Sequence, residues 1–188
     1  MKRNILKTTG MLAIAVCLTL TATAGGDPVT VGGAPMYPTK NIIENAVNSK
    51  DHTTLVAAVK AAGLVETLSG KGPFTVFAPT NEAFNALPAG TVDGLLKPEA
   101  KGTLTKVLTY HVIAGKYDSD ALAKDIKAGN GTAKLKTVGG SYLTFKMSGP
   151  KSITVTDENG GTAHISIANV YQSNGVIHVV DKVLMPKM

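Results

Sequence analysis

The side chains most able to do chemistry in this chain are three histidines and one aspartate. His111 follows Tyr110 in an apolar run, His178 and Asp181 share a second apolar run, and His164 falls on the polar face of a predicted strand. Imidazole and carboxylate groups in apolar surroundings either transfer protons and recognise ligands, or satisfy hydrogen bonds within the fold. Both interpretations are open for His111, a recognition residue or a buried ring bonded to the backbone.

A metal site is one chemistry that these residues suggest. If the strands that carry His164 and His178 are neighbours, the two rings can meet. However, no pair of histidines has ligand spacing, and the only cysteine, Cys17, lies in the N-terminal apolar run. The turn 157–161 resembles half of a calcium loop but lacks the downstream bidentate glutamate. The sequence therefore predicts no metal and no other cofactor.

Catalysis finds little support in the motifs. The chain has no GxSxG, HExxH or phosphate-binding loop, so we expect no enzyme. The weaker alternative, an enzyme, requires Asp181, His111 or another titratable group to open into a cleft with a partner in reach. Asp181 either faces solvent or pairs with a lysine or with His111, because a lone buried carboxylate is too costly.

The first 24 residues read as a signal peptide. A positive segment, 1–7, precedes an apolar run, 10–20, and small residues lead up to Ala24. The sequence therefore predicts cleavage near Ala24 and export to the periplasm or the exterior. A membrane anchor needs ~20 apolar residues, more than this run offers, and lipidation of Cys17 is a lesser alternative.

Charge and composition argue against nucleic acid as a partner. Removing residues 1–24 takes away two lysines and Arg3, so Lys plus Arg falls from 19 to 16 while all 13 acidic residues remain. The formal net charge thus falls from +6 to +3. The remaining chain has neither arginine, the usual bidentate reader of phosphates and bases, nor tryptophan. Weak attraction to anionic polysaccharide or to a cell surface stays open.

Short helices dominate the first half of the predicted mature chain. Residues 25–38 contain several prolines and glycines and are predicted to form a flexible leader. The string FTVFAPTNEAF, 74–84, reads as a buried strand that runs into a helix capped by Thr80. The other expected helices are 41–47, one capped by Asp51 and ended at Gly63, one after Pro98, and one capped by Asp118 or Ser119. Two short apolar turns are expected at 64–68 and 92–96.

Strands dominate the second half. Residues 110–113 break the helical period and read as a strand, and after Gly131 the apolar pattern alternates with period two. The expected strands and turns are 134–138, a hairpin turn at 139–140, 142–147, 153–155, 163–167, a turn at Asn174-Gly175, and a central strand over 176–185. Helices followed by strands predict a single α+β domain over residues 39–188.

Three strings together resemble the fasciclin domain family: FTVFAPTNEAF at 74–84, TYHV at 109–112 and NGVIHVVDKVLMP at 174–186. The chain is most similar to secreted, single-domain bacterial members. The resemblance implies a wedge of two β-sheets flanked by several short helices. The family-motif residues, expected to be mainly structural with binding as an alternative, are Phe77, Thr80, Asn81, Phe84, Tyr110, His111, Asn174, Gly175, His178 and Asp181.

The resemblance implies adhesion, through contact with a cell-surface or matrix protein or polysaccharide, by a monomer or weak homo-oligomer that does not span a membrane. An integrin-type site is not expected, since Asn169 replaces the acidic residue found ahead of the last motif in animal relatives. The alternative is a periplasmic or secreted small-ligand carrier. Its apolar pocket would lie between helices and sheet, with the turns 64–68 and 92–96 as candidate linings.

Overall fold

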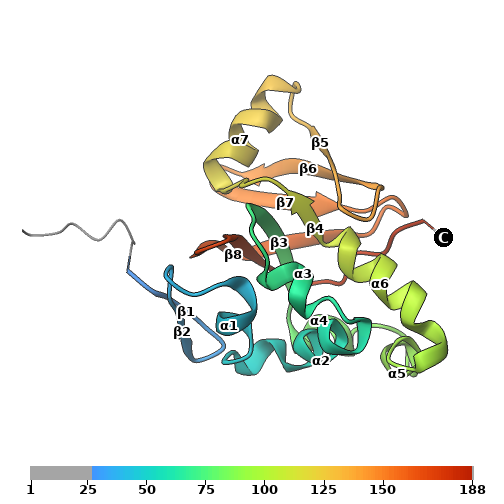
Figure 1. Cartoon of the computed structure of the whole chain (residues 1–188). Helices are drawn as coiled ribbons and strands as arrows, with labels where there is room; N and C mark the ends of the chain where they lie inside the picture. Colours follow the sequence, from blue (N-terminus) through green and yellow to red (C-terminus); the bar gives the residue numbers. More distant parts are fainter. Residues whose placement is uncertain (1–26, 188) are drawn as a thin grey trace, which may run out of the picture.

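A seven-stranded arrangement in the order β4-β3-β9-β8-β7-β6-β5 forms the frame of the protein in a computed structural model that describes residues 27–187 (Figure 1). The predicted signal peptide, its cleavage position and Cys17 lie outside these residues. The strands are β1 (Val29–Val31), β2 (Ala34–Met36), β3 (Phe74–Pro79), β4 (Val112–Ala114), β5 (Ala133–Lys136), β6 (Tyr142–Gly149), β7 (Ser152–Thr156), β8 (Thr162–Gln172) and β9 (Gly175–Val180).

The α-helices all precede β5 in the chain, which confirms a helix-rich first half and a strand-rich second half. They are α1 (Ile42–Ala46), α2 (Thr53–Ala62), α3 (Val65–Ser69), α4 (Asn81–Asn85), α5 (Thr91–Leu95), α6 (Lys101–Tyr110) and α7 (Ser119–Ala128), with 3₁₀ turns η1 (Lys50–His52) and η2 (Pro98–Ala100). Figure 1 shows α7 beside β5 and β6, whereas α1 to α5 gather at the opposite end of the molecule.

The long strand β8 divides the strands into two sheets. Its residues 162–164 pair with β7, and its residues 165–172 pair with β9. Two register shifts interrupt the β8–β9 pairing, one on each side of Ile167, and such bulges bend a strand. The change of partner along β8 accounts for the two sheets that the resemblance implies. It also extends this strand well beyond the expected 163–167.

The central strand β3 is buried on both faces, which explains its continuous apolar run. It lies between β4, antiparallel, and β9, parallel. Side chains alternate along a strand, so Val76 and Ala78 join a core under the helices α2, α4 and α6. Phe77 joins a second core under α7 and the strands β5 to β7. One strand therefore contributes to both hydrophobic cores.

Local signals predicted two helix starts correctly and one wrongly. The Thr80 hydroxyl accepts from Ala83 N at the start of α4, and the Asp118 carboxylate accepts from Ala121 N at the start of α7. Asp51 instead lies in the 3₁₀ turn η1, and α2 begins after His52 without a side-chain cap from that residue. The cap prediction failed because the chain inserts one 3₁₀ turn before the helix.

The prediction of a flexible leader is wrong for residues 29–36. This segment forms the β1–β2 hairpin, in which Val31 and Met36 are buried in the helix-side core. Asn45 of α1 fixes the end of the hairpin: its Oδ1 accepts from Tyr37 N (3.0 Å) and its Nδ2 donates to Tyr37 O (2.8 Å). Prolines and glycines shape the hairpin here, and its apolar residues hold it against the domain.

Two strand boundaries also differ from expectation. Tyr110 is the last residue of α6 and His111 is its C-cap, so the helix continues into the segment expected to be a strand and β4 begins at Val112. The last strand ends at Val180, and Asp181 follows it. The first place is the buried end of a helix, and the second is a buried irregular segment. Both are apolar, and periodicity alone does not distinguish them from a strand.

The parallel approach of β3 and β9 generates the first prediction. A Cβ atom at Gly175 would lie 2.0 Å from Phe74 O, so we expect Gly175→Ala to lower the free energy of unfolding by about 2–3 kcal/mol. Gly94→Ala in α5 is the matched control, since its Cβ meets nothing within 4 Å and alanine favours helices by up to ~1 kcal/mol. Urea denaturation of both variants measures this; equal stabilities would contradict the close approach.

Candidate functional site

The Tyr-His motif lies at the junction of α6 and β4, fully enclosed. His111 Nδ1 lies 2.8 Å from Val107 O, and Leu184 N donates to His111 Nε2 at 3.0 Å. Because a carbonyl only accepts and an amide N–H only donates, the ring is neutral with its proton on Nδ1. Burial lowers the pKa of His111 to about 4. The ring joins the end of α6 to the C-terminal segment and has no nitrogen free for a ligand.

Tyr110 occupies the second core, and its hydroxyl reaches the edge of that core. The hydroxyl donates to Tyr142 O (2.9 Å) and accepts from Glu158 N (3.1 Å). Burial raises the pKa of this hydroxyl to about 12, so it stays protonated and keeps donating. Tyr110 thereby ties α6 to β6 and to the turn between β7 and β8.

Asn174 connects segments that lie far apart in the chain. Its Oδ1 accepts from Ile42 N (3.0 Å), and its Nδ2 donates to Leu68 O (2.8 Å) and Gly70 O (3.0 Å). The side chain therefore satisfies the start of α1 and the end of α3 from the turn that leads into β9. It is a tertiary cap as well as the expected turn former.

The motif residues around α4 are also held by structural contacts. Asn81 Oδ1 accepts from Thr54 N (3.0 Å), and Asn81 Nδ2 donates to Lys50 O (2.8 Å), so this side chain braces the start of α2. Phe84 is buried in the helix-side core. Together with the Thr80 cap, these contacts position α4 against α2.

The histidines of β8 and β9 do not meet. His178 is buried, stacks on Phe77 with ring centroids 5.5 Å apart, and its Nε2 donates to Tyr117 O (2.8 Å). His164 is exposed, and its backbone N–H donates to Asp181 Oδ1 (2.7 Å). Asp181 is thus on the solvent side, one of its two expected arrangements. Across residues 27–187, no group of three or more metal-ligating side chains is placed to hold a metal ion.

Asn169, where animal relatives carry an acidic residue, has a structural role. Its backbone is left-handed, with φ of 60°, a conformation that asparagine tolerates better than most residues. Its Oδ1 accepts from Ser119 N and its Nδ2 donates to Ser119 Oγ, both at 2.7 Å. These bonds attach β8 to the start of α7.

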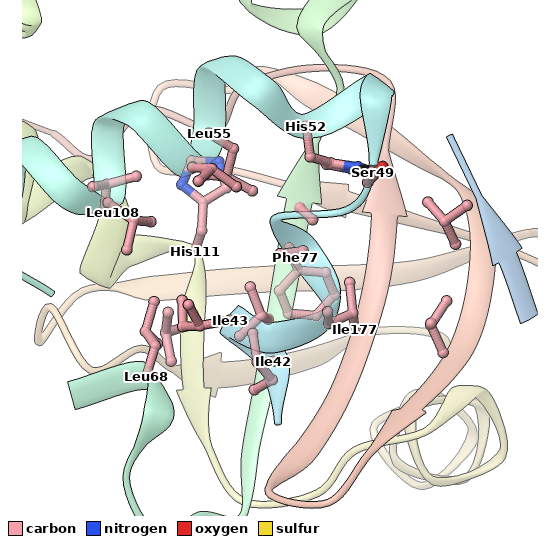
Figure 2. Close-up of a pocket in the computed structure, with 18 of the residues that line it drawn as sticks. Ile42, Ile43, Ser49, His52, Leu55, Leu68, Phe77, Leu108, His111 and Ile177 are labelled. Atoms are coloured by element: carbon pink, nitrogen blue, oxygen red, sulfur yellow. Dashed lines mark hydrogen bonds between the residues drawn. The ribbon is translucent and has the colours of Figure 1, made fainter. Parts of the chain in front are cut away.

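An apolar cavity of about 50 Å³ lies between the sheet and the helices α1, α2 and α3 (Figure 2). Its walls are mostly aliphatic, and its few polar neighbours include His52 and Ser49. Of the two turns expected to line a pocket, only 64–68 does so, through Val65 and Leu68. The turn 92–96 packs against the core instead. The cavity is the feature that the carrier alternative requires.

A polar groove of about 550 Å³ lies beside the Asn174-Gly175 turn. Its lining residues come from the start of α1, the α3–β3 loop, Lys116 and the β8–β9 turn. Lys71 and Lys116 are exposed at this groove, and the described residues that line it include no carboxylate. Lys116 Nζ lies 4.8 Å from the centre of the Tyr171 ring. The groove therefore presents positive charge beside backbone and amide polar groups.

Sequence reasoning missed the polar residues Ser49 and His52 of the cavity and the lysines of the groove. His52 and Ser49 carried only the weak signal of a histidine three residues after a serine at a helix start. Lys71 and Lys116 are two of many lysines, and only the fold brings them, 45 positions apart in the chain, to one groove. The motif residues themselves were easier to find, because their strings are long and their order is specific.

Comparison with known proteins settles the family. The Fasciclin domain model matches residues 50–186. The chain belongs to the fasciclin domain family. Protein sll1483 of Synechocystis sp. is 50% identical over 147 residues, which cover 78% of this chain and 74% of that protein. The cell surface glycolipoprotein MPB83 of Mycobacterium bovis is 35% identical over 164 residues, which cover 85% of this chain and 65% of that protein.

The fold agrees with a solved fasciclin structure. A FAS1 domain pair from the insect cell adhesion molecule Fasciclin I superposes with a TM-score of 0.56 and 25% sequence identity, covering 70% of this chain and 43% of that one. The predicted family and the α+β class are therefore confirmed. Within residues 27–187 of this fasciclin domain, no helix is both long and apolar enough to cross a bilayer.

The buried histidines of this fasciclin domain generate a pH prediction. The pKa of His111 is lowered from 6.5 to about 4, so as the pH falls below 6.5 the unfolded chain takes up the proton first and stability is lost. The loss grows down to about pH 4 and amounts to about 3 kcal/mol for this residue. Burial also lowers the pKa of His52 and of His178, which adds loss in the same direction.

Urea denaturation between pH 7 and pH 4 measures this dependence. His111→Gln is expected to be less stable at pH 7 and to show a shallower loss of stability with falling pH. His164→Gln, which replaces an exposed histidine, is expected to retain the wild-type curve. An unchanged pH slope in His111→Gln would show that His111 is already protonated in the folded protein or does not control its acid stability.

Proposed function

We propose that this protein is an exported adhesion module that binds anionic polysaccharide or protein at a cell surface through the polar groove, without catalysis. The observation that carries this proposal is the pair Lys71 and Lys116 at a groove whose described lining residues include no carboxylate. Fasciclin I is a cell adhesion molecule and MPB83 is a cell surface glycolipoprotein. Because this chain is similar to both, their names support the proposal that it too acts at a surface.

The chemistry of the groove suits an acidic partner. Lysine ammonium groups attract carboxylate or sulfate groups over a range set by the Debye length, ~8 Å at physiological ionic strength. The contact of Lys116 with the Tyr171 ring restrains one ammonium group at the rim. Lys71 lies in the loop between α3 and β3, which Asn174 fixes through Gly70 O. Lys116 is thus restrained through its side chain and Lys71 through its loop, which lowers the entropy cost of binding.

The proposal includes export, with cleavage near Ala24 and function in the periplasm or outside the cell.

The proposal also includes the absence of catalysis. Both nitrogens of His111 are engaged by the backbone, and Asp181 is exposed and accepts from His164 N. His111 lines the apolar cavity without a free ring nitrogen, and Asp181 is engaged at the surface, which argues against the weaker enzyme alternative.

The groove can be tested by reversing its charge. We expect Lys71→Glu/Lys116→Glu to weaken binding to immobilised alginate, an anionic polysaccharide, by about tenfold or more at low salt. Lys124→Glu/Lys127→Glu makes the same change in net charge on exposed residues of α7 and is the matched control. Surface plasmon resonance at two salt concentrations, with dextran as the neutral comparison, measures the effect. An equal loss in both double variants would assign binding to net charge and reject the groove.

The apolar cavity supports a second candidate function, a secreted small-ligand carrier. Val65 and Leu68 of the predicted lining contribute to it, and its position between helices and sheet is the one expected. Native mass spectrometry of the protein isolated from its own host separates the two functions. A bound small molecule that is lost on denaturation favours the carrier, whereas the bare chain favours adhesion.

A further inference from the structure

His52 is a buried polar side chain with an unused hydrogen-bonding atom. The residue is 3% exposed and lines the apolar cavity, and Figure 2 shows it beside Ser49 at the edge of the apolar side chains. Its Nδ1 lies 2.9 Å from Ser49 Oγ. Its Nε2 is the one buried side-chain nitrogen or oxygen without a hydrogen-bond partner in residues 27–187. Such groups are rare in folded proteins because each loses its hydration without replacement.

The surrounding groups determine which ring nitrogen carries the proton. Ser49 is 2% exposed, and its hydroxyl has no hydrogen bond within the described chain other than the one to His52. A buried hydroxyl needs an acceptor, so the Ser49 O–H donates to Nδ1 and the His52 proton resides on Nε2. The backbone of Ala78 acts as a weak acceptor toward the ring and raises the pKa of His52, but it does not complete a hydrogen bond with Nε2.

His52 lines a cavity whose other described walls offer its Nε2–H little else. His111 also lines the cavity, but both of its nitrogens are engaged. The other cavity walls are predominantly aliphatic side chains and Phe77. A buried water usually needs about three polar partners, which these walls do not provide. An apolar molecule that carries an oxygen acceptor can pack against the aliphatic walls and accept a hydrogen bond from Nε2–H.

The dimensions and charge of the cavity narrow the class of molecule. Its volume of about 50 Å³ exceeds the ~10–15 Å³ that one water requires, so a compact apolar group fits. The half-buried side chains of Ile43, Ala46, Val56 and Val65 form a rim through which a longer molecule can extend. Burial lowers the pKa of His52, which keeps the ring neutral. Lys60 also lines the cavity, but it is exposed to solvent. The neutral donor His52 compensates poorly for burying a carboxylate, so the acceptor beside it is uncharged.

We propose that this cavity binds a small, mainly apolar molecule with one uncharged oxygen acceptor, which receives a hydrogen bond from His52 Nε2–H. The inference rests on the carrier candidate and deepens it, and it is independent of the polar groove. It assigns His52 as the specificity residue, Ser49 as the residue that sets its tautomer, and the aliphatic walls as the source of affinity.

The test compares two probes that differ by the acceptor. Cyclohexanone and methylcyclohexane are titrated into the ¹⁵N-labelled protein and followed by NMR chemical shifts. We expect His52→Leu to weaken binding of the ketone about tenfold, the value of one net hydrogen bond, without weakening binding of the hydrocarbon. His164→Leu, at an exposed histidine, is expected to leave both affinities unchanged. Val59→Phe, which fills the cavity wall, is expected to abolish binding of both probes.

Each outcome decides the proposal. Failure of both probes to bind overturns the site, and an equal change in both affinities in His52→Leu overturns the donor role of His52. If His52→Leu does not fold, the long-range ¹H–¹⁵N spectrum of the wild-type histidine rings replaces it: a proton on Nε2 of His52 that shifts on adding ketone supports the proposal, and a proton on Nδ1 overturns it. Alginate binding by Val59→Phe reports separately on the groove, so failure of one function does not imply failure of the other.

Discussion

The close parallel approach of β3 and β9 at the Asn174-Gly175 turn is the constraint on which the rest of the fold depends. A side chain at Gly175 would collide with Phe74 O, and Phe74 N donates to Asn174 O at 3.0 Å. The Asn174 side chain then reaches outward to the start of α1 and the end of α3. One turn late in the chain therefore positions two early helices relative to the central strands, and both candidate hollows border the elements that it holds.

This arrangement explains why the motif residues themselves offer so little chemistry. The buried end of α6 and the buried strand β9 leave polar side chains no water, so His111 and His178 are neutral rings bonded to backbone groups. Tyr110 and Asn81 likewise join segments distant in the sequence. The motif specifies the framework of the fasciclin domain. The hollows that we propose as binding sites lie beside it, at Lys71 and Lys116 and around His52.

The two hollows call for different kinds of partner because they differ in chemistry. The groove is polar, carries positive charge and borders the β8–β9 turn; its attraction is electrostatic and therefore sensitive to salt. The cavity is apolar and lies under α1, α2 and α3, with one unused donor in its wall. Affinity there comes from removing apolar surface from water, and specificity comes from the cost of leaving Nε2–H unpaired.

The sequence by itself determined what depends on near neighbours and on long specific strings. Period-two and helical patterns located most strands and helices, Thr80 and Asp118 were recognisable as caps, and three motifs in order identified the family. The tertiary structure decided what depends on contacts between distant residues. Composition predicted a flexible leader at 25–38, but burial of Val31 and Met36 holds part of it in a hairpin. Only the fold could bring Asn174 to Ile42 N, across 132 positions, or enclose His52 in an apolar wall. Residue propensities predict the local backbone conformation. Which side chains are buried, and which groups form hydrogen bonds with each other, depends on which surfaces pack together.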